Sequence, residues 1–353
     1  GRNQSQALQA HGFHCARGGA DIGRMAGAGE HDVDVVEKIG KLGFVHIAGC
    51  LYWRPKSIMS GYCSLKKSNR LSAGRYCTCR LAYFVLEIPM NPILNTALKA
   101  ARRAGDMMVR ASGNLSSLKI NNKAFNDFVS DVDRESENII LQVLQEAYPH
   151  HKITTEESGS HGSEKAEYEW IIDPLDGTTN YLHGHPQYAI SMALLHKGVL
   201  QEALIYAPER NDLYMASRGQ GALLNDRRIR ASSRNELNHC LIGTGFPVVD
   251  QSMMDTYLAI LRDLLARTAG GRREGAAALD LCAVACGRFD GFFEFNLKPW
   301  DIAAGALIAS EAGAIVTDMQ GEQSWLESGN IVCANPKVLA QMLHIIQKHL
   351  PAA

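Results

Sequence analysis

Long apolar runs and paired cysteine motifs are absent from this sequence, and each absence excludes a class of protein. Within its 353 residues no apolar run approaches the roughly 20 residues that a membrane-spanning helix needs. The chain does not open with a basic stretch followed by an apolar one, so we expect no secretory signal. Its nine cysteines are an odd number without a C-x-x-C pair, which argues against a disulfide framework. We therefore expect a cytoplasmic protein with no membrane contact.

A strong net charge is also lacking, but the charge is unevenly distributed. The formal net charge is -1, yet residues 1–89 carry twelve basic and six acidic side chains. This stretch has no sustained apolar period, and its basic character is compatible with a nucleic-acid-binding arm. No recognised motif supports that reading. We expect an N-terminal extension that is poorly ordered or non-native, with Met90 as the native start.

From Met90 onward the apolar residues recur regularly. They predict an N-terminal α+β lobe with an antiparallel sheet over 90–230 and a C-terminal α/β lobe over 231–353. The expected helices are 93–105 or slightly longer, 133–148, 253–267, 274–286, 301–313 and one that opens at Asn335-Pro336; the expected strands include 188–195, 201–206, 212–217, 289–295 and 314–318.

The most informative stretch runs from Trp170 to Asn180 and reads W-I-I-D-P-L-D-G-T-T-N. Its apolar start predicts a buried strand. Pro174 fixes a backbone angle and Gly177 permits a tight turn, so Asp173 and Asp176 can point toward one place. Two carboxylates and a freed carbonyl form a hard-oxygen set that suits Mg²⁺ beside a phosphate. The alternative is an ordinary acidic surface turn, which a preceding buried strand makes less favourable.

Further acidic residues allow two readings each. Asp301 follows Pro299-Trp300 at the start of an Ala- and Gly-rich helix, where an Asp is first of all an N-cap. A helix N-terminus also accepts an anion, so capping does not exclude a site. Asp133 is either the N-cap of its helix or a catalytic group. His183 and His185 are expected to be solvated loop residues, because imidazole suits softer metals.

Three motifs resemble the signatures of the inositol monophosphatase family, and the bacterial extragenic-suppressor type most of all. They are E-E-S at 156–158, D-P-L-D-G-T-T-N at 173–180 and P-W-D at 299–301, in the family's order and approximate spacing. The resemblance runs from Met90 to near the C-terminus. It implies a layered αβαβα sandwich of the sugar-phosphatase type, which inositol monophosphatase and fructose-1,6-bisphosphatase share, with the active site at the lobe junction.

The resemblance also implies the site residues of a Mg²⁺-dependent phosphomonoesterase. The first metal would be held by Glu156, Asp173 and the carbonyl of Leu175, and the second by Asp173, Asp176 and Asp301. Glu156 would serve a weaker third ion through water, and Mn²⁺ is an alternative metal. Thr178, oriented by Asp133, would hold the attacking water.

On the substrate side, the resemblance implies that Gly177 and Thr178 donate backbone N–H groups to the phosphate. Glu294 and the backbone of 275–277 (Gly275, Ala276 and Ala277) would contact inositol hydroxyls beside Asp301. Relatives usually have Ser or Thr at the position of Ala276, which leaves the fine substrate preference open.

The expected substrate is therefore myo-inositol monophosphate, with Li⁺ sensitivity and a homodimer implied by the family. Alternative substrates are fructose-1,6-bisphosphate, 3′-phosphoadenosine 5′-phosphate, histidinol phosphate and NADP. A hypothesis of another class is binding to transcription or RNA machinery, with phosphatase activity secondary. Basic residues that could serve it are Arg227, Arg228, Arg230, Arg234, Arg272 and Arg273, although a solvated surface is the simpler reading.

Overall fold

The computed structural model describes residues 46–47, 50–51, 91–114, 120–124, 127–247 and 251–351. The chain divides into two units, 1–83 and 84–353. In the first, the short strands β1 (His46–Ile47) and β2 (Cys50–Leu51) pair antiparallel. The rest of the predicted extension lies outside the described residues, so its expected disorder and the boundary at Met90 stay predictions. No described helix has the length and apolar character needed to cross a membrane.

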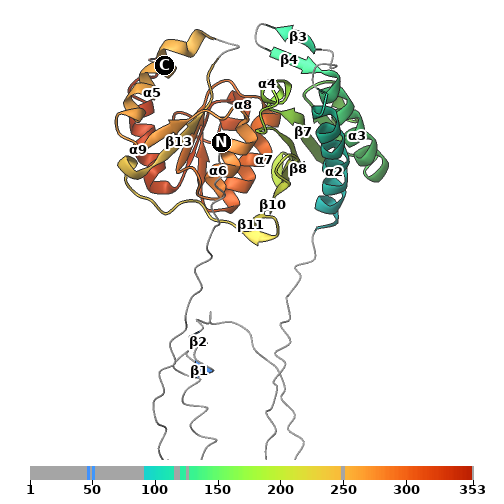
Figure 1. Ribbon diagram of the computed structural model, residues 1–353, viewed down its shortest axis with the longest axis horizontal. Coiled ribbons are helices and arrows are strands. Elements are labelled where there is room, and N and C mark those ends of the chain that lie inside the picture. Colours follow the sequence, from blue (N-terminus) through green and yellow to red (C-terminus); the bar gives the residue numbers. More distant parts are fainter. Residues whose placement is uncertain are drawn as a thin grey trace, which may run out of the picture. The chain divides into compact units, whose positions relative to one another are not determined.

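An eight-stranded sheet, of which Figure 1 labels β7, β8, β10 and β11, forms one layer of the second unit, in the order β12-β11-β10-β9-β8-β7-β5-β6. Its strands are β5 (Lys152–Thr155), β6 (Gly159–His161), β7 (Tyr168–Asp176), β8 (Ala189–His196), β9 (Val199–Ala207), β10 (Asp212–Ser217), β11 (Gly221–Leu224) and β12 (Arg227–Arg228). The prediction of an antiparallel sheet is wrong for one pair, because β5 and β7 are parallel. β6 runs back antiparallel along one side of β5. The chain then reverses again, so β7 pairs along the other side of β5 in the same direction as β5.

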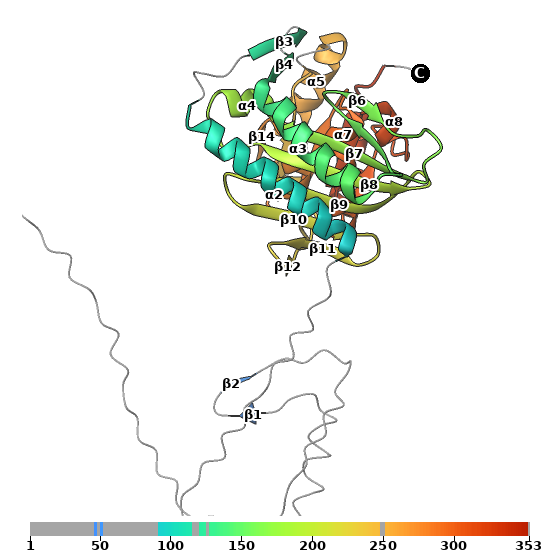
Figure 2. The same cartoon turned by 90° about the vertical axis from the view of Figure 1, so that its right-hand side faces the viewer.

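Two long helices cover one face of this sheet, as Figure 2 shows. They are α2 (Pro92–Ser112) and α3 (Asp131–Ala147), and their apolar faces pack on Trp170, Ile172 and other buried residues of the strands. α2 continues past Gly105, where an added Cβ would lie 2.7 Å from the ring of Tyr206. Glycine therefore lets this helix approach β9 closely. A separate hairpin joins β3 (Ile120–Ala124) and β4 (Asp127–Ser130).

The opposite face packs on α6 (Ala277–Ala285) and α7 (Pro299–Glu311), and these helices also cover a five-stranded sheet. Its order is β14-β13-β15-β17-β16, with strands β13 (Leu241–Thr244), β14 (Gly270–Arg272), β15 (Gly291–Glu294), β16 (Ile315–Thr317) and β17 (Ile331–Ala334). α5 (Met254–Leu265) and α9 (Pro336–Ile346) form the second outer layer, on the far side of the five-stranded sheet. These layers confirm the predicted αβαβα sandwich. Short elements connect them: α4 (Thr178–Leu182), η2 (Leu237–His239), η3 (Gln251–Met253) and α8 (Trp325–Ser328).

Several predicted helix starts are wrong by a few residues. α6 begins at Ala277 rather than at residue 274, because Gly275 has a φ of +84° and Ala276 is extended. α3 begins at Asp131, so Asp133 lies inside its first turn and is not the N-cap. Asn335 does cap α9 as predicted, with its side chain accepting from two backbone N–H groups.

Candidate active site

The acidic motif lies at the end of β7 and contains a β-bulge. Asp173 pairs with Ser191 and Asp176 pairs with Ala189, so β7 spans three steps where β8 spans two. The extra residue at Pro174-Leu175 breaks the alternation of side chains, so Asp173 and Asp176 lie on the same face, opposite two residues of β8 that are two apart. The turn itself starts at Gly177, whose φ is +92°. β7 therefore continues through both aspartates to Asp176, and the turn that Gly177 permits follows it.

Strand pairing brings Glu156 to the same place. In the parallel pair, Thr155 of β5 lies opposite Ile172 of β7. The next residues along the two strands are Glu156 and Asp173, so both leave the same edge of the sheet. An acidic residue that the sequence places far from the motif thus becomes its neighbour.

The two aspartates are buried and each is anchored through one oxygen. Asp173 is 2% exposed, and its Oδ1 accepts from the backbone N–H of Leu175 at 2.8 Å. Asp176 is 7% exposed, and its Oδ2 accepts from the N–H of Ala278, in the first turn of α6, at 2.8 Å. These bonds fix the carboxylates and tie the turn to the helix across the lobe junction.

Asp301 belongs to the same cluster but is not an N-cap. It occupies the third position of α7, and its Oδ2 accepts from the backbone N–H of Lys298 at 2.7 Å. Ser191 donates to the carbonyl of Trp300 at 3.0 Å, which holds the start of this helix against β8. Asp301 thus accepts a backbone hydrogen bond at the start of the helix and also lies near the other acids, as the sequence allowed.

Electrostatics show how closely these acids are grouped. Burial raises the pKa of Asp173 well above its usual range, and the nearby Glu156, Asp176 and Asp301 raise it further. Burial likewise raises the pKa of Asp176, with Asp301, Glu294 and Glu156 adding to the effect. A buried cluster of like charges is costly unless a cation compensates it.

Thr178 connects this cluster to α3. Its hydroxyl donates to Asp133 Oδ1 at 2.8 Å and lies 3.2 Å from the carbonyl oxygen of Leu175. Asp133 is 1% exposed, so it faces inward from the helix. The structure therefore places the predicted water-orienting pair within one hydrogen bond.

Two further residues of α3 reach the site and were missed in the sequence. Ser136 donates to the carbonyl of Pro174 at 2.8 Å, and Glu137 accepts from the N–H of Glu157 at 3.0 Å. Both side chains are buried. Together with Asp133 they continue the apolar stripe of Ile140 and Leu144 at helical spacing. Buried polar residues on that stripe were the available signal.

The predicted substrate-binding segment 275–277 lies against the turn. A Cβ built on Gly177 would lie 3.3 Å from Cβ of Ala276 and 2.8 Å from the carbonyl oxygen of Gln187. Asn180, a third residue, to which the sequence assigned no role, donates its amide to the carbonyls of Gln187 at 2.7 Å and Glu274 at 2.8 Å. Asn180 thus fastens the start of α6 to the turn.

Glu294 lies at the end of β15 and is partly buried. Burial and the proximity of Asp301 raise its pKa to about 8, while Arg273 opposes the shift. The predicted hydroxyl-binding acid is therefore within electrostatic reach of the metal-site acids. His183 and His185 are exposed, as expected.

The donor set fits a hard divalent cation. It consists of carboxylate oxygens and one backbone carbonyl, which Mg²⁺ prefers. Among the described side chains, no three acidic, histidine or cysteine groups are arranged closely enough around one point to enclose an ion. The fit therefore rests on donor chemistry and on clustered, buried negative charge. The roles of the individual residues stay predictions.

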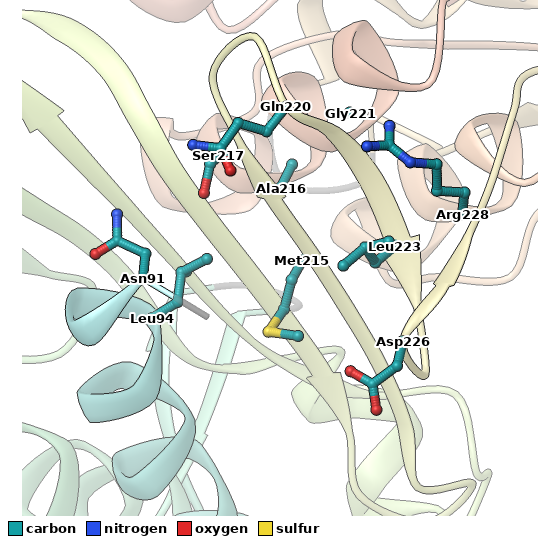
Figure 3. Close-up of a pocket in the computed structure, with 10 residues that line it drawn as sticks. All are labelled: Asn91, Leu94, Met215, Ala216, Ser217, Gln220, Gly221, Leu223, Asp226 and Arg228. Atoms are coloured by element: carbon teal, nitrogen blue, oxygen red, sulfur yellow. The ribbon is translucent and has the colours of Figure 1, made fainter. Parts of the chain in front are cut away.

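A cavity of about 100 Å³ lies elsewhere, between the start of α2 and the β10–β11 hairpin (Figure 3). None of the predicted site residues lines it. Its lining consists of Asn91, Leu94, Met215, Ala216, Ser217, Gln220, Gly221, Leu223, Asp226 and Arg228.

Comparisons with known proteins agree with this architecture. Residues 90–350 match the model of the inositol monophosphatase family. A relative from Neisseria meningitidis serogroup B has been provisionally named Nus factor SuhB. It is 82% identical over 261 residues, which are 74% of this chain and 100% of the relative. The Nus factor SuhB of Pseudomonas aeruginosa is 48% identical over 266 residues, covering 74% of this chain and 98% of the relative.

Solved structures give the same result. The extragenic suppressor protein SuhB of Bartonella henselae superposes with a TM-score of 0.72 at 41% identity, covering 74% of this chain and 100% of that one. The inositol monophosphatase of Anabaena superposes with a TM-score of 0.65 at 36% identity, covering 73% and 96%. The chain therefore belongs to the inositol monophosphatase family, a family of phosphatases.

Proposed function

We propose that this chain is a Mg²⁺-dependent phosphomonoesterase that hydrolyses myo-inositol monophosphate to inositol and phosphate. The main support is that four acids, Glu156, Asp173, Asp176 and Asp301, lie within electrostatic reach of one another beside the turn that carries the Thr178–Asp133 pair. Family membership supports the phosphatase class. The metal and the substrate go beyond it.

The first metal would be held by Glu156, Asp173 and the carbonyl of Leu175, and the second by Asp173, Asp176 and Asp301. Mn²⁺ could replace Mg²⁺, and a third ion would reach Glu156 through water. Bound divalent ions neutralise phosphate oxygens and lower the pKa of bound water. We propose Li⁺ sensitivity by the same family analogy.

The protein's own groups would orient the nucleophile. The Thr178 hydroxyl donates a hydrogen bond to Asp133, so its oxygen can accept a hydrogen bond from a water. That water would attack the phosphorus in line, forming a new P–O bond while the bond to the inositol oxygen breaks. The attacking water releases one proton to solvent and the leaving alkoxide takes one up, so the products are inositol and inorganic phosphate. The N–H groups of Gly177 and Thr178, in a left-handed turn at the start of α4, would hold phosphate oxygens.

Glu294, Asp301 and the backbone of 275–277 would bind the polyol hydroxyls. Ala276 has only a methyl side chain, so this position offers no hydroxyl to the substrate. The main alternative is therefore another small phosphorylated substrate, such as fructose-1,6-bisphosphate or NADP. Release of inorganic phosphate from inositol 1-phosphate and from each alternative, with and without Mg²⁺, tests the proposal. We expect inositol 1-phosphate to give the highest kcat/KM; a clear preference for another compound would contradict it.

A second candidate role is binding to transcription or RNA machinery in the cytoplasm. The names of the relatives as Nus factors support it, as do exposed arginines at 227, 228 and 230. A homodimer is proposed from the family alone. Capture of partners by a Thr178→Ala variant would separate binding from catalysis, because the role should survive loss of turnover. Size-exclusion chromatography with light scattering tests the dimer.

A further inference from the structure

Gly245 follows β13 at the point where the neighbouring strand carries Glu294. In the parallel pair of β13 and β15, Thr244 lies opposite Phe293. One step further along, Gly245 is therefore beside Glu294. Side chains at paired positions of neighbouring strands lie on the same face, so a residue at 245 competes with Glu294 for space.

The Glu294 side chain occupies that space. A Cβ built on Gly245 would lie 1.7 Å from Oε1, 2.0 Å from Cδ and 2.3 Å from Oε2 of Glu294. All three nearest atoms belong to the carboxylate. Any side chain at position 245 would therefore displace the carboxylate from its place.

The backbone at Gly245 cannot readily move to relieve such a clash. Thr244 is 3% exposed, and its hydroxyl lies 3.2 Å from both the carbonyl oxygen of Gly245 and the hydroxyl of Tyr257. Tyr257 is fully buried and stacks on Phe293, with ring centroids 5.7 Å apart. The end of the flexible Glu294 side chain is the part that can shift.

The next residue, Phe246, contacts an arginine side chain that lies near the same carboxylate. Phe246 packs edge-on against Tyr257 at 6.0 Å, and the Arg273 guanidinium lies 5.2 Å from the Phe246 ring centroid. Arg273 opposes the rise in the pKa of Glu294, so the two groups are electrostatically coupled. The Gly245-Phe246 segment thus lies beside both a carboxylate and a guanidinium.

We propose that Gly245 is a specificity-determining position, which keeps the Glu294 carboxylate where it accepts hydrogen bonds from the hydroxyls of a phosphorylated polyol. The inference rests on the proposed function. The substrate class it selects carries vicinal hydroxyls next to the phosphate ester. Gly245 acts through Glu294 and is a positioning residue, with no contact to the phosphate required.

The test compares Gly245→Ala with wild type on inositol 1-phosphate and on phenyl phosphate, which has no hydroxyls. We expect KM for inositol 1-phosphate to rise roughly tenfold or more, since a hydrogen bond to a charged group is lost, while kcat changes little. The loss in kcat/KM should be much larger for inositol 1-phosphate than for phenyl phosphate. Gly113→Ala is the matched control, because its nearest contact would be 3.5 Å away. Equal losses on both compounds, or none, would overturn the inference.

A double-mutant cycle removes the ambiguity of a folding defect. In a Glu294→Ala background the carboxylate is gone, so adding Gly245→Ala should cost no further kcat/KM and should fold even if the single variant does not. Additive losses, or a double variant that fails to fold, would contradict positioning through Glu294. If wild type hydrolyses phenyl phosphate but not inositol 1-phosphate, the proposed substrate is wrong and this inference falls with it, whatever the variants do.

Discussion

Thr178 and Asp133 are joined by a hydrogen bond of 2.8 Å, although 45 residues separate them in the sequence. The bond links the turn after β7 to the first turn of α3. Because the hydroxyl has a single proton, its donation to a buried carboxylate fixes which side of the Thr178 oxygen can accept. The pair is thus preorganised to hold a water near the acidic cluster.

Thr178→Ala should lower kcat by about 10²-fold or more while KM changes little, because the lost contact to the water matters in the transition state. Thr178→Ser keeps the hydroxyl and should retain most activity. Steady-state kinetics on inositol 1-phosphate measure both. A raised KM with unchanged kcat would instead assign Thr178 to substrate binding.

Asp173→Asn should abolish turnover and raise the melting temperature in EDTA. The change removes a buried negative charge that three nearby acids destabilise, so the metal-free fold gains stability while metal binding is lost. Asp226→Asn, an exposed control, should do neither. Substantial Mg²⁺-dependent activity in folded Asp173→Asn protein would refute the metal-site assignment.

Ser136→Ala should destabilise the protein by about 1–3 kcal/mol, because the buried carbonyl of Pro174 loses its donor. The bulge that carries Asp173 would loosen, so half-maximal activity should need more Mg²⁺. Ser112→Ala removes a comparable serine–carbonyl bond at 2.9 Å on the exposed end of α2 and should have little effect. Denaturant titration and Mg²⁺ titration of activity measure the two effects. Equal behaviour of the two variants would argue against a supporting role for Ser136.

Glu202 should make stability depend on pH. Its carboxylate accepts from Asn91 Nδ2 and from Ser217 Oγ, two residues that line the cavity of Figure 3, yet burial raises its pKa. The folded protein then holds this proton more tightly than the unfolded chain, so stability from this group is lost as pH rises through its folded pKa. The melting temperature of Glu202→Gln relative to wild type should increase from pH 4 to pH 8. The exposed control Glu327→Gln should show no such trend; a flat difference for Glu202→Gln would contradict the shift.

A chain that begins at Met90 should retain full Mg²⁺-dependent activity and a similar melting temperature. All proposed ligands lie between Asp133 and Asp301, and the family match covers 90–350. Limited proteolysis of the full chain should trim it toward the same boundary. An insoluble or inactive Met90 chain, beside an active full-length protein, would make the N-terminal segment part of the fold.

Local patterns in the sequence predicted the helices, the order of the two lobes and the acidic motif, while the layered arrangement was implied by the family resemblance. The apolar spacing identified the helices, and the Pro/Gly turn marked where β7 delivers its acids. The positive φ of Gly275 delays the start of α6, and α3 opens at Asp131, two residues earlier than predicted. Such angles are not encoded in an apolar period.

Local sequence patterns do not show which residues far apart in the chain become neighbours. The parallel register of β5 and β7 brings Glu156 beside Asp173, and only the family resemblance grouped them beforehand. The amide of Asn180 and the hydroxyl of Ser136 bond to backbone carbonyls, which every residue carries, so no sequence pattern identifies the partners. The contact of Gly245 with Glu294 depends on strand register in the same way.

Anomalous diffraction from crystals of the protein grown with Mn²⁺ and inorganic phosphate tests the central claim most directly. We expect metal peaks bounded by the carboxylates of Asp173, Asp176 and Asp301, with phosphate on the N–H groups of Gly177 and Thr178. Metal bound elsewhere, or none at these carboxylates at saturating Mn²⁺, would contradict it.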